Sequence, residues 1–391
     1  ESTTLVRQWH SARVETLQTL LPDRPWEVGS SRRLTARPFG GASLLNPATQ
    51  RIHLYYRCGW RGKMGRTCLA LSSDGRHFFK PALGGDGNNV VIEAAANEAT
   101  EIVYDHIARP PRFVALRNEA MPLRDAHPFF LPWRRYTSLD GVRWRLDIHS
   151  AAAKGVGVMP DRSSFFLNPL RHRPVWTFSL RENLCRAGPS GHMRARRYVE
   201  QPHDERSPGW PPVRWGHYVR DYFQCARART DEPVVWTGID SSDCDFGMCD
   251  LYALDGLAYE SVLLHSLAVL HRPKYSGETK NNSVHLAFSR DGFHLSRPPP
   301  PGSARWRVPF LSPQRHTREA DGRILSVSNV QMAHGSPIIR GDELLFYFGY
   351  AATRGHEPEP PTAVVTGDYF EGTGLAVLRR DGFASMGPPR D

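Results

Sequence analysis

Short runs in which apolar and polar residues alternate recur along the whole chain, and this spacing is typical of β-strands with one buried face. Five runs rich in aromatic and β-branched residues are predicted to be the innermost strands of repeated units. They cover residues 52–57, 112–116, 175–180, 262–270 and 344–350. No run of about 18 apolar residues occurs, so the pattern predicts no membrane span.

An Asp-Gly dipeptide closes four of the predicted units, at Asp74, Asp140, Asp291 and Asp381. Asp-Gly between apolar strands is a strong hairpin signal, because the turn requires a positive φ that glycine adopts without steric cost. The interval between Asp140 and Asp291 is about twice the usual length, so a unit without this turn is predicted within it. Residues 215–222 are the candidate strand for that unit.

Five units of four short strands predict an all-β fold, a five-bladed β-propeller over residues 36–391. Residues 1–35 form a separate N-terminal segment, in which the apolar spacing allows one amphipathic helix that ends at Pro22. Residues 181–212 are rich in Arg, Pro and Gly and are predicted to be a long loop between strands. The prolines at 298–301 are predicted to lie in a surface loop.

The charge of the chain says little about its partners. Lys and Arg total 50 against 40 Asp and Glu, and the net charge of +10 is interpreted first as a solvated basic surface; attraction to an acidic polymer, a uronic-acid glycan or a nucleic acid, is the alternative. No nucleic-acid-binding motif is present, so nucleic acid is not a predicted partner.

The six cysteines contain no Cys-x-x-Cys pair, which argues against a thiolate metal site. Cys58 with Cys68, or Cys244 with Cys249, could form a disulfide. Neither the cysteines nor the N-terminus decides between a cytoplasmic and a secreted protein.

Several segments resemble one known group of proteins. They are the Asp-Gly turns, Tyr259-Glu260-Ser261, Asn329-Val330-Gln331 and the terminal stretch 373–386. They are similar to bacterial proteins related to glycoside hydrolase family 32, among the invertase-like and arabinanase-like five-bladed β-propeller glycosidases. The resemblance covers residues 22–386 and implies this fold and a hydrolase that cleaves glycosidic bonds, of a furanoside or of a plant or microbial glycan. The invertase motifs themselves are absent: Arg37-Pro38-Phe39-Gly40-Gly41 stands where those enzymes carry a catalytic Asp.

Glycoside hydrolysis requires two carboxyl groups beside one bond, one protonated and one ionised. Acids at the start of the innermost strands of a propeller should converge on its axis, and Glu98, Asp161 and Glu260 precede strands of successive units. Glu260 is the predicted general acid and Asp161 the nucleophile or base, because apolar neighbours would desolvate both. Glu98 would orient the sugar or modulate a pKa. Glu101 replaces Glu98 if the register shifts, and is otherwise predicted to face solvent.

Residues near these acids carry groups suited to sugars. Arginine can bind a hydroxyl or an acid, amides and imidazole bind hydroxyls, and aromatic rings stack on a sugar face. The predicted substrate-binding residues are Arg37, Phe39, Trp60, Arg162, Tyr259, Asn329, Gln331 and His334. Each could equally serve the fold alone, in a turn, an ion pair or the core.

No cofactor and no metal ligand are predicted for this site. Asp240, Asp243, Asp245 and Asp250 form an acidic stretch that could bind calcium, but the spacing is not that of an EF-hand loop, and a solvated loop is the preferred interpretation. Two other functions stay open: a glycoside phosphorylase, in which arginines would bind phosphate, and a glycan-binding propeller without catalysis. The oligomeric state is not predicted.

Overall fold

The structure is a computed structural model that describes residues 5–28, 34–61, 64–93, 100–118, 130–131, 133–147, 159–160, 162–185, 192–204, 234–245, 248–271, 281–313, 317–318, 322–355 and 367–388. It confirms the all-β prediction: apart from the short 3-10 helix η1 (Pro25–Glu27), the elements of these residues are strands. Within the same residues no helix is long and apolar enough to cross a membrane.

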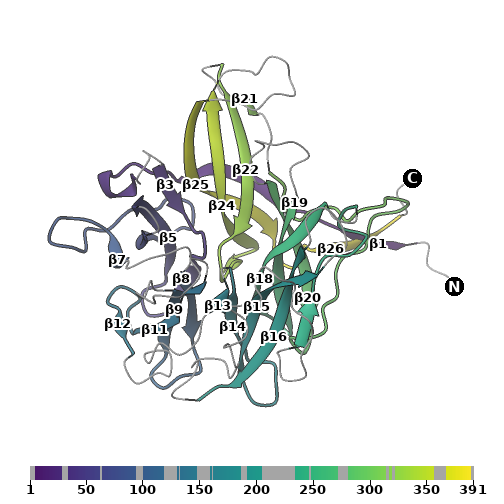
Figure 1. Ribbon diagram of the computed structural model, residues 1–391, viewed down its shortest axis with the longest axis horizontal. Coiled ribbons are helices and arrows are strands. Elements are labelled where there is room, and N and C mark those ends of the chain that lie inside the picture. Colours follow the sequence, from purple (N-terminus) through teal and green to yellow (C-terminus); the bar gives the residue numbers. More distant parts are fainter. Residues whose placement is uncertain are drawn as a thin grey trace.

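Three antiparallel sheets occupy the middle of the chain (Figure 1). The first has the order β12 (Arg145–Leu146), β11 (Trp133–Ser138), β9 (Arg112–Asn118), β8 (Thr100–Asp105). The second has the order β14 (Ser164–Asn168), β15 (Val175–Cys185), β16 (His192–Pro202), β17 (Val234–Thr237). The third has the order β18 (Cys249–Tyr259), β19 (Val262–His271), β20 (Asn281–Ser289).

The two ends of the chain meet in an 11-stranded sheet. Its main path is β21 (Thr317–Arg318), β22 (Ile324–Met332), β24 (Glu343–Gly355), β25 (Gly367–Arg379), β3 (Leu34–Arg37), β5 (Arg51–Arg61), β6 (Met64–Ser72), β7 (Val90–Ile92). Off this path, β2 (Arg13–Leu20) pairs with β25, β23 (Ile338–Arg340) with β24, and β4 (Ser43–Asn46) with β5. The contact of β25 with β3 is parallel, whereas the other pairings of this sheet are antiparallel.

Two small sheets complete the fold. They are β1 (Val6–Trp9) with β26 (Ala384–Gly387), and β10 (Phe130–Leu131) with β13 (Met159–Pro160). Both chain ends lie on the side of the molecule where β1 and β26 pair (Figure 1).

Three of the four Asp-Gly turns are built from the same hydrogen bonds. In the first, Gly75 N donates to Ser72 Oγ at 2.8 Å, and Asp74 Oδ1 accepts the backbone N–H groups of Arg76 and His77. The turns at positions 140 and 291 repeat this arrangement, with serine two residues before the aspartate. The glycine of each has φ between 75° and 88°, as predicted. The fourth turn differs, because Asp381 and not its glycine has the positive φ.

Two of these turns also bind tyrosines from distant strands, one within the 11-stranded sheet and one between two sheets. Tyr347 of β24 donates its hydroxyl hydrogen to Gly75 O at 2.6 Å, and Tyr55 of β5 donates to Gly141 O at 2.7 Å. A Cβ added to Gly141 would lie 2.5 Å from the Tyr55 hydroxyl. Glycine is therefore required both for the turn and for the close approach of the neighbouring sheet.

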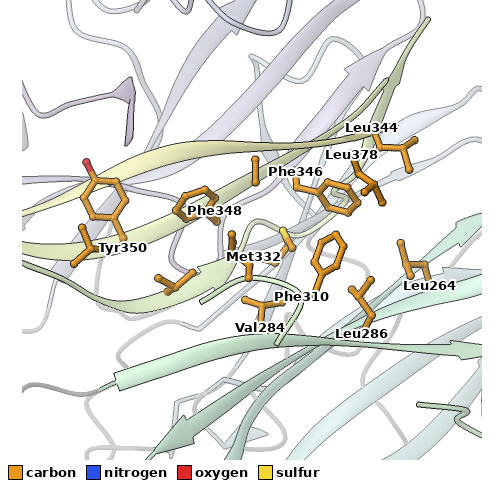
Figure 2. Close-up of a cluster of buried hydrophobic side chains, with 14 of the residues drawn as sticks. Leu264, Val284, Leu286, Phe310, Met332, Leu344, Phe346, Phe348, Tyr350 and Leu378 are labelled. Atoms are coloured by element: carbon orange, nitrogen blue, oxygen red, sulfur yellow. The ribbon is translucent and has the colours of Figure 1, made fainter. Parts of the chain in front are cut away.

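The hydrophobic core lies between successive sheets. Figure 2 shows Leu264, Val284 and Leu286 of the β18–β20 sheet facing Phe346 and other aromatic residues of β24, with Phe310 and Met332 in the same cluster. Similar clusters join β5 and β6 to β8 and β9, and β8 and β9 to β14 and β15. Burial of these side chains is the main force that holds the sheets together.

The prediction of a helix in the N-terminal segment is wrong. Its residues form β1 and β2, and these pair with β26 and β25 near the opposite end of the chain. The apolar spacing fits a helix, but the unpaired edges of distant strands offer hydrogen bonds that the local pattern does not reveal.

The prediction of a long loop at 181–212 is also wrong in its first half. β15 and β16 form a long hairpin with continuous pairing from Val175–Pro202 to Cys185–His192. The candidate strand at 215–222 lies outside the described residues. Both possible disulfides form, Cys58–Cys68 between β5 and β6, and Cys244–Cys249 before β18.

Candidate active site

Three ionisable side chains from distant parts of the chain meet at one buried point, called the centre below. They are Glu101 of β8, Asp255 of β18 and His334, which follows β22. His334 Nδ1 lies 3.6 Å from Glu101 Oε2 and 3.6 Å from Asp255 Oδ1, too far for ordinary hydrogen bonds. One ligand atom from each residue lies within 4.8 Å of the other two. These three named atoms are buried and have no hydrogen-bond partner in the described part of the chain.

The acids of the centre stand on the edge strands of their sheets, β8 and β18. The runs at 112–116, 175–180 and 262–270, which the sequence pattern marks as innermost, lie in β9, β15 and β19, and each of these strands has a partner on both sides. These runs therefore mark the central strands of their sheets, whereas the acids of the centre stand on edge strands. Aromatic and β-branched runs mark the strands that are flanked and buried, not those at an edge.

The backbone at His334 is fixed by the segment before β4. Ser43 N donates to His334 O at 2.8 Å, and His334 N donates to Gly41 O at 3.0 Å. A Cβ on Gly335, which has φ +75°, would lie 2.7 Å from Ser43 O, and a Cβ on Gly41 would clash with Tyr55 O. The two glycines thus permit the close contact that carries the imidazole to the centre.

The environment separates the three pKa values. Burial, and then the Asp255 charge, raise the pKa of Glu101 to about 8. Burial would also raise the pKa of Asp255, but His334 and Arg162 outweigh it and hold that pKa below its ordinary value. For His334 burial acts downward, and the two carboxylates outweigh it, so its pKa is raised. At neutral pH the centre can therefore offer one protonated and one ionised carboxyl group.

Arg162, a predicted binding residue, lies beside the centre. Its Nη1 is 3.9 Å from Glu101 Oε1, and its side chain is 3% exposed. Arg196 Nη1 donates to the backbone oxygen of Arg162 at 2.7 Å, which fixes a residue whose φ is +60°. The guanidinium carbon of Arg162 lies 4.5 Å from the centroid of the Phe39 ring. Arg162 therefore connects the centre with the residues around Phe39.

Two more guanidinium groups surround the Phe39 ring. The guanidinium carbons of Arg37 and Arg57 lie 4.9 Å and 4.8 Å from its centroid. Glu371 bridges them, with 3.3 Å from its Oε1 to Arg37 Nη1 and 2.6 Å from its Oε2 to Arg57 Nη2. Burial raises the pKa of Glu371, but Arg57 and Arg37 outweigh this and lower it to about 2. The predicted residues Arg37 and Phe39 thus lie in one charged, largely buried group.

Asn329 and Gln331 belong to the same region. Arg37 Nη2 donates to Asn329 O at 2.6 Å, and Gln331 Nε2 donates to Asn329 Oδ1 at 2.9 Å. Six of the eight predicted binding residues are therefore gathered around the centre. They are Arg37, Phe39, Arg162, Asn329, Gln331 and His334.

The structure places Glu260 elsewhere, and the expected desolvation of its carboxylate is wrong. Glu260 occupies the turn between β18 and β19 with φ +50°, its side chain is 53% exposed, and it pairs with Arg380 at 2.8 Å. Its neighbour Tyr259 donates to Asp381 and packs edge-on against Phe383, away from the centre. The apolar flanks of Glu260 are strand residues, but a hairpin turn carries the acid itself into solvent.

Three predicted residues stay without a test of their position. Asp161 and Glu98 lie outside the described residues, and only the backbone of Trp60, within β5, is described. Glu101, expected to face solvent, is instead 2% exposed.

The sequence analysis does not identify Asp255, although a glycine follows it. The three equivalent turns have serine two residues before aspartate, whereas Ala253 holds that place here. Gly256 serves packing inside β18, because an added Cβ would lie 2.8 Å from the Phe166 ring. A requirement for Ser-x-Asp-Gly would have separated Asp255 from the turns and marked it as an acid within an apolar strand.

The acidic stretch before β18 is paired with arginines. Asp243, whose side chain is fully buried, accepts from Arg297 and from Arg307 Nη1 at 3.2 Å. Asp240 Oδ1 accepts from Arg307 Nη1 at 2.6 Å. The solvated loop predicted here is wrong for Asp243, because arginines supply the positive charge beside its carboxylate.

No family model and no curated protein matches the chain. Solved structures do match its fold. One is a glycosyl hydrolase from Bacteroides ovatus, with a TM-score of 0.50 at 12% identity, covering 98% of this chain and 97% of that one. Another is an N-acetylgalactosamine deacetylase from F. plautii in complex with blood group B trisaccharide, with a TM-score of 0.51 at 13% identity, covering 96% of each chain. At these identities the likeness establishes a shared fold and does not establish family 32.

Proposed function

We propose that the chain is a hydrolase that acts on a glycan and cleaves a glycosidic bond with Glu101 and Asp255 as its two carboxyl groups. The observation that supports this most is the meeting of two acids from separate sheets at one buried point, with ligand atoms within 4.8 Å. This pair takes the place of Asp161 and Glu260. The fold shared with a glycosyl hydrolase supports the assignment at the level of fold.

In this proposal the two carboxyl groups have different roles. Glu101, with a pKa of about 8, holds the proton that the leaving oxygen receives. Asp255 stays ionised and attacks the anomeric carbon. Retaining glycosidases place their carboxyl groups about 5–5.5 Å apart, closer than inverting enzymes do, so the spacing of this pair favours retention through a covalent glycosyl intermediate. His334 stabilises the charge on Asp255.

We also propose that the sheets form five blades over residues 36–391. The parallel contact of β25 with β3 divides the 11-stranded sheet into two units, which together with the other three sheets make five. The turn contacts and the clusters between successive sheets support a ring. The edge strands β8 and β18 then face the axis, where the centre lies.

The test compares the parent with Glu101→Gln and Asp255→Asn on a panel of aryl glycosides and plant polysaccharides, with release of reducing sugar as the readout. Both variants should lose about 10²–10⁴-fold in kcat/KM. Glu260→Gln, a carboxylate at an exposed turn, is the matched control and should keep the parent rate. The proposal is wrong if both centre variants act as fast as the parent. Turnover that requires inorganic phosphate, or sugar binding without turnover, would also contradict it.

A second candidate is hydrolysis of an acyl group on a sugar at a divalent metal ion. Two buried carboxylate oxygens and one imidazole nitrogen lie close together and have no hydrogen-bond partner among the described residues, and they form a donor set that such ions accept. Glu101, Asp255 and His334 would hold the ion, which would polarise the acyl oxygen and activate water. The fold shared with a deacetylase favours testing this.

The two candidates differ in their response to chelation. Activity on an aryl glycoside that survives dialysis against EDTA supports the carboxyl pair. Release of acetate from N-acetylgalactosamine that EDTA abolishes and Mn²⁺ or Zn²⁺ restores supports the metal centre.

A further inference from the structure

Three amide side chains form a buried cluster near the centre. Asn329 Oδ1 accepts two hydrogen bonds of 2.9 Å, one from Asn282 Nδ2 and one from Gln331 Nε2. Asn282 lies in β20 and the other two residues lie in β22, so the cluster bridges two sheets. Asn282 is 0% exposed and Gln331 is 1% exposed. The three residues are called the amide cluster below.

The outer ends of two of these amides are unsatisfied. Asn282 Oδ1 and Gln331 Oε1 are buried and have no hydrogen-bond partner within the described ranges. Buried polar groups without a partner destabilise a fold, and nearly all such groups in native proteins are bonded to protein, water or ligand. Two unsatisfied acceptors on neighbouring amides therefore lack a partner among the described residues, and a hydroxyl group of a bound molecule could supply it.

The conclusion does not depend on which terminal atom of each side-chain amide is the oxygen and which is the nitrogen. Reversing all three would make Asn329 the donor to the other two, and would then leave an N–H₂ end unsatisfied on Asn282 and on Gln331. A hydroxyl group can donate to an amide oxygen or accept from an amide nitrogen, so it satisfies either arrangement.

The backbone at Asn329 is shaped to present this cluster. Asn329 has φ +53°, and the pairing of β22 with β24 is interrupted between Ser328 and Gln331, which is a β-bulge. Bulges and left-handed non-glycine residues cost free energy and are concentrated at functional sites, where they redirect side chains. Arg37 Nη2, which donates to Asn329 O at 2.6 Å, holds the strained residue in place.

A chain of side-chain contacts connects the amide cluster with the centre. Arg37 binds Asn329 and packs on the Phe39 ring, and Arg162 packs on the same ring and approaches Glu101. A sugar with its reacting bond at Glu101 could therefore extend toward the amides.

We propose that the amide cluster binds two neighbouring hydroxyl groups of the sugar and so determines which sugar the site accepts. This inference rests on the proposed function and adds a hydroxyl-binding subsite made of Asn282, Asn329 and Gln331. A site built to bond hydroxyls rejects analogues that lack them, because its polar groups are then left buried and unpaired.

The experiment measures binding in the Glu101→Gln variant, so that no sugar is consumed. The probes are D-galactose, L-arabinose, D-xylose and N-acetyl-D-galactosamine, followed by the single-deoxy derivatives of any sugar that binds, with affinity read by saturation-transfer NMR and calorimetry. Asn282→Leu and Gln331→Met are then added separately. Gln18→Met, at an exposed position of β2, is the matched control.

We expect one sugar to bind, and we expect removal of one hydroxyl, or either amide substitution, to weaken it about tenfold or more. The melting temperature of the sugar-free protein should change little, because each substitution removes one hydrogen bond to Asn329 Oδ1 together with one unsatisfied buried oxygen. The proposal is overturned if both variants bind sugar as the control does and melt at a lower temperature, since the amides would then be structural. It is also overturned if no probe binds.

Failure of this inference can be told from failure of the proposed function. If Glu101→Gln alone still hydrolyses glycosides while Gln331→Met loses sugar binding, the amide subsite stands and the carboxyl pair is wrong. If Glu101→Gln is inactive and neither amide substitution changes the affinity for sugar, the carboxyl pair stands and the subsite is wrong.

Discussion

Two of the groups of buried acids in the described residues differ in their hydrogen bonding. In the loop before β18, Asp243 is fully buried and meets the guanidinium groups of Arg297 and Arg307. In the centre, Glu101 and Asp255 are almost as deeply buried, yet one oxygen of each has no hydrogen-bond partner among the described atoms. The first group is satisfied by the chain itself, whereas the second is not.

This difference is the basis on which we assign a structural role to the first group and propose a catalytic role for the second. A buried carboxylate with arginine partners holds two segments together, and removal of either partner is costly. Buried carboxyl groups left unsatisfied, with pKa values moved apart, lower stability and persist where a reaction needs them. Burial alone would not distinguish the two groups. Their hydrogen-bond and ion-pair partners do.

The largest expected effect is the loss of kcat/KM when an acid of the centre is replaced. Glu101→Gln should reduce kcat/KM by about 10²–10⁴-fold while the free energy of unfolding stays the same or rises, because a poorly satisfied acid is removed. Urea unfolding and steady-state rates measure both quantities. If the variant loses stability and keeps its rate, Glu101 is a structural residue and the proposed role is wrong.

The opposite result is expected at the arginine-paired loop. Asp243→Asn leaves the buried guanidinium group of Arg297 without its nearest carboxylate and leaves Arg307 with Asp240 alone, and should cost about 3–5 kcal/mol of stability. The rate per folded molecule should equal that of the parent, because the loop does not contribute to the centre. A change in urea midpoint below that of an exposed control such as Glu260→Gln would show that the loop is not structural.

Buried histidines with shifted pKa values make the stability of the protein depend on pH. The carboxylates raise the pKa of His334, whereas burial lowers the pKa of His53 and of His285 to about 4. Unfolded histidine titrates near 6.5, so the unfolded chain takes up protons first and stability falls as pH drops from about 6.5 to about 4, by at most about 3 kcal/mol for each of the two. Urea unfolding across this range should show the loss, and His285→Asn should reduce it. Stability that rises toward pH 4 would contradict these assignments.

The smallest effect concerns the turns that join the sheets. Gly141 has φ +75° and Gly341 has φ +56°, but only at Gly141 would a Cβ meet a neighbour, the Tyr55 hydroxyl. Gly341→Ala should cost about 1 kcal/mol from backbone strain, and Gly141→Ala about 1–3 kcal/mol more from the clash. Thermal unfolding of the two variants measures the difference. Equal costs would mean that the turn does not hold the neighbouring sheet.

The parts of the fold that are local in sequence were predictable. The Ser-x-Asp-Gly turns follow from four consecutive residues, and their glycines have the predicted φ. The strands of the N-terminal segment were not predictable, since their partners are strands near the other end of the chain. Apolar spacing alone could not decide between helix and strand there.

The candidate site was predictable as a set of binding groups but not as a set of acids. Arg37, Arg162 and His334 were predicted to bind sugar, and the structure brings them near one another. Glu260 was chosen and the buried Asp255 was missed, because desolvation was inferred from neighbours in sequence, whereas it depends on which strand lies at the edge of its sheet. That order is a property of pairing over long distances and leaves no mark within one segment.

The most direct test of the account is a crystal structure of the Glu101→Gln variant with a bound sugar. We predict that the anomeric carbon lies about 3–3.5 Å from an oxygen of Asp255. The glycosidic oxygen that leaves should lie beside the side chain of residue 101. A sugar bound away from these two residues, or a metal ion ligated by Asp255 and His334 with no sugar carbon beside them, would contradict the carboxyl-pair mechanism.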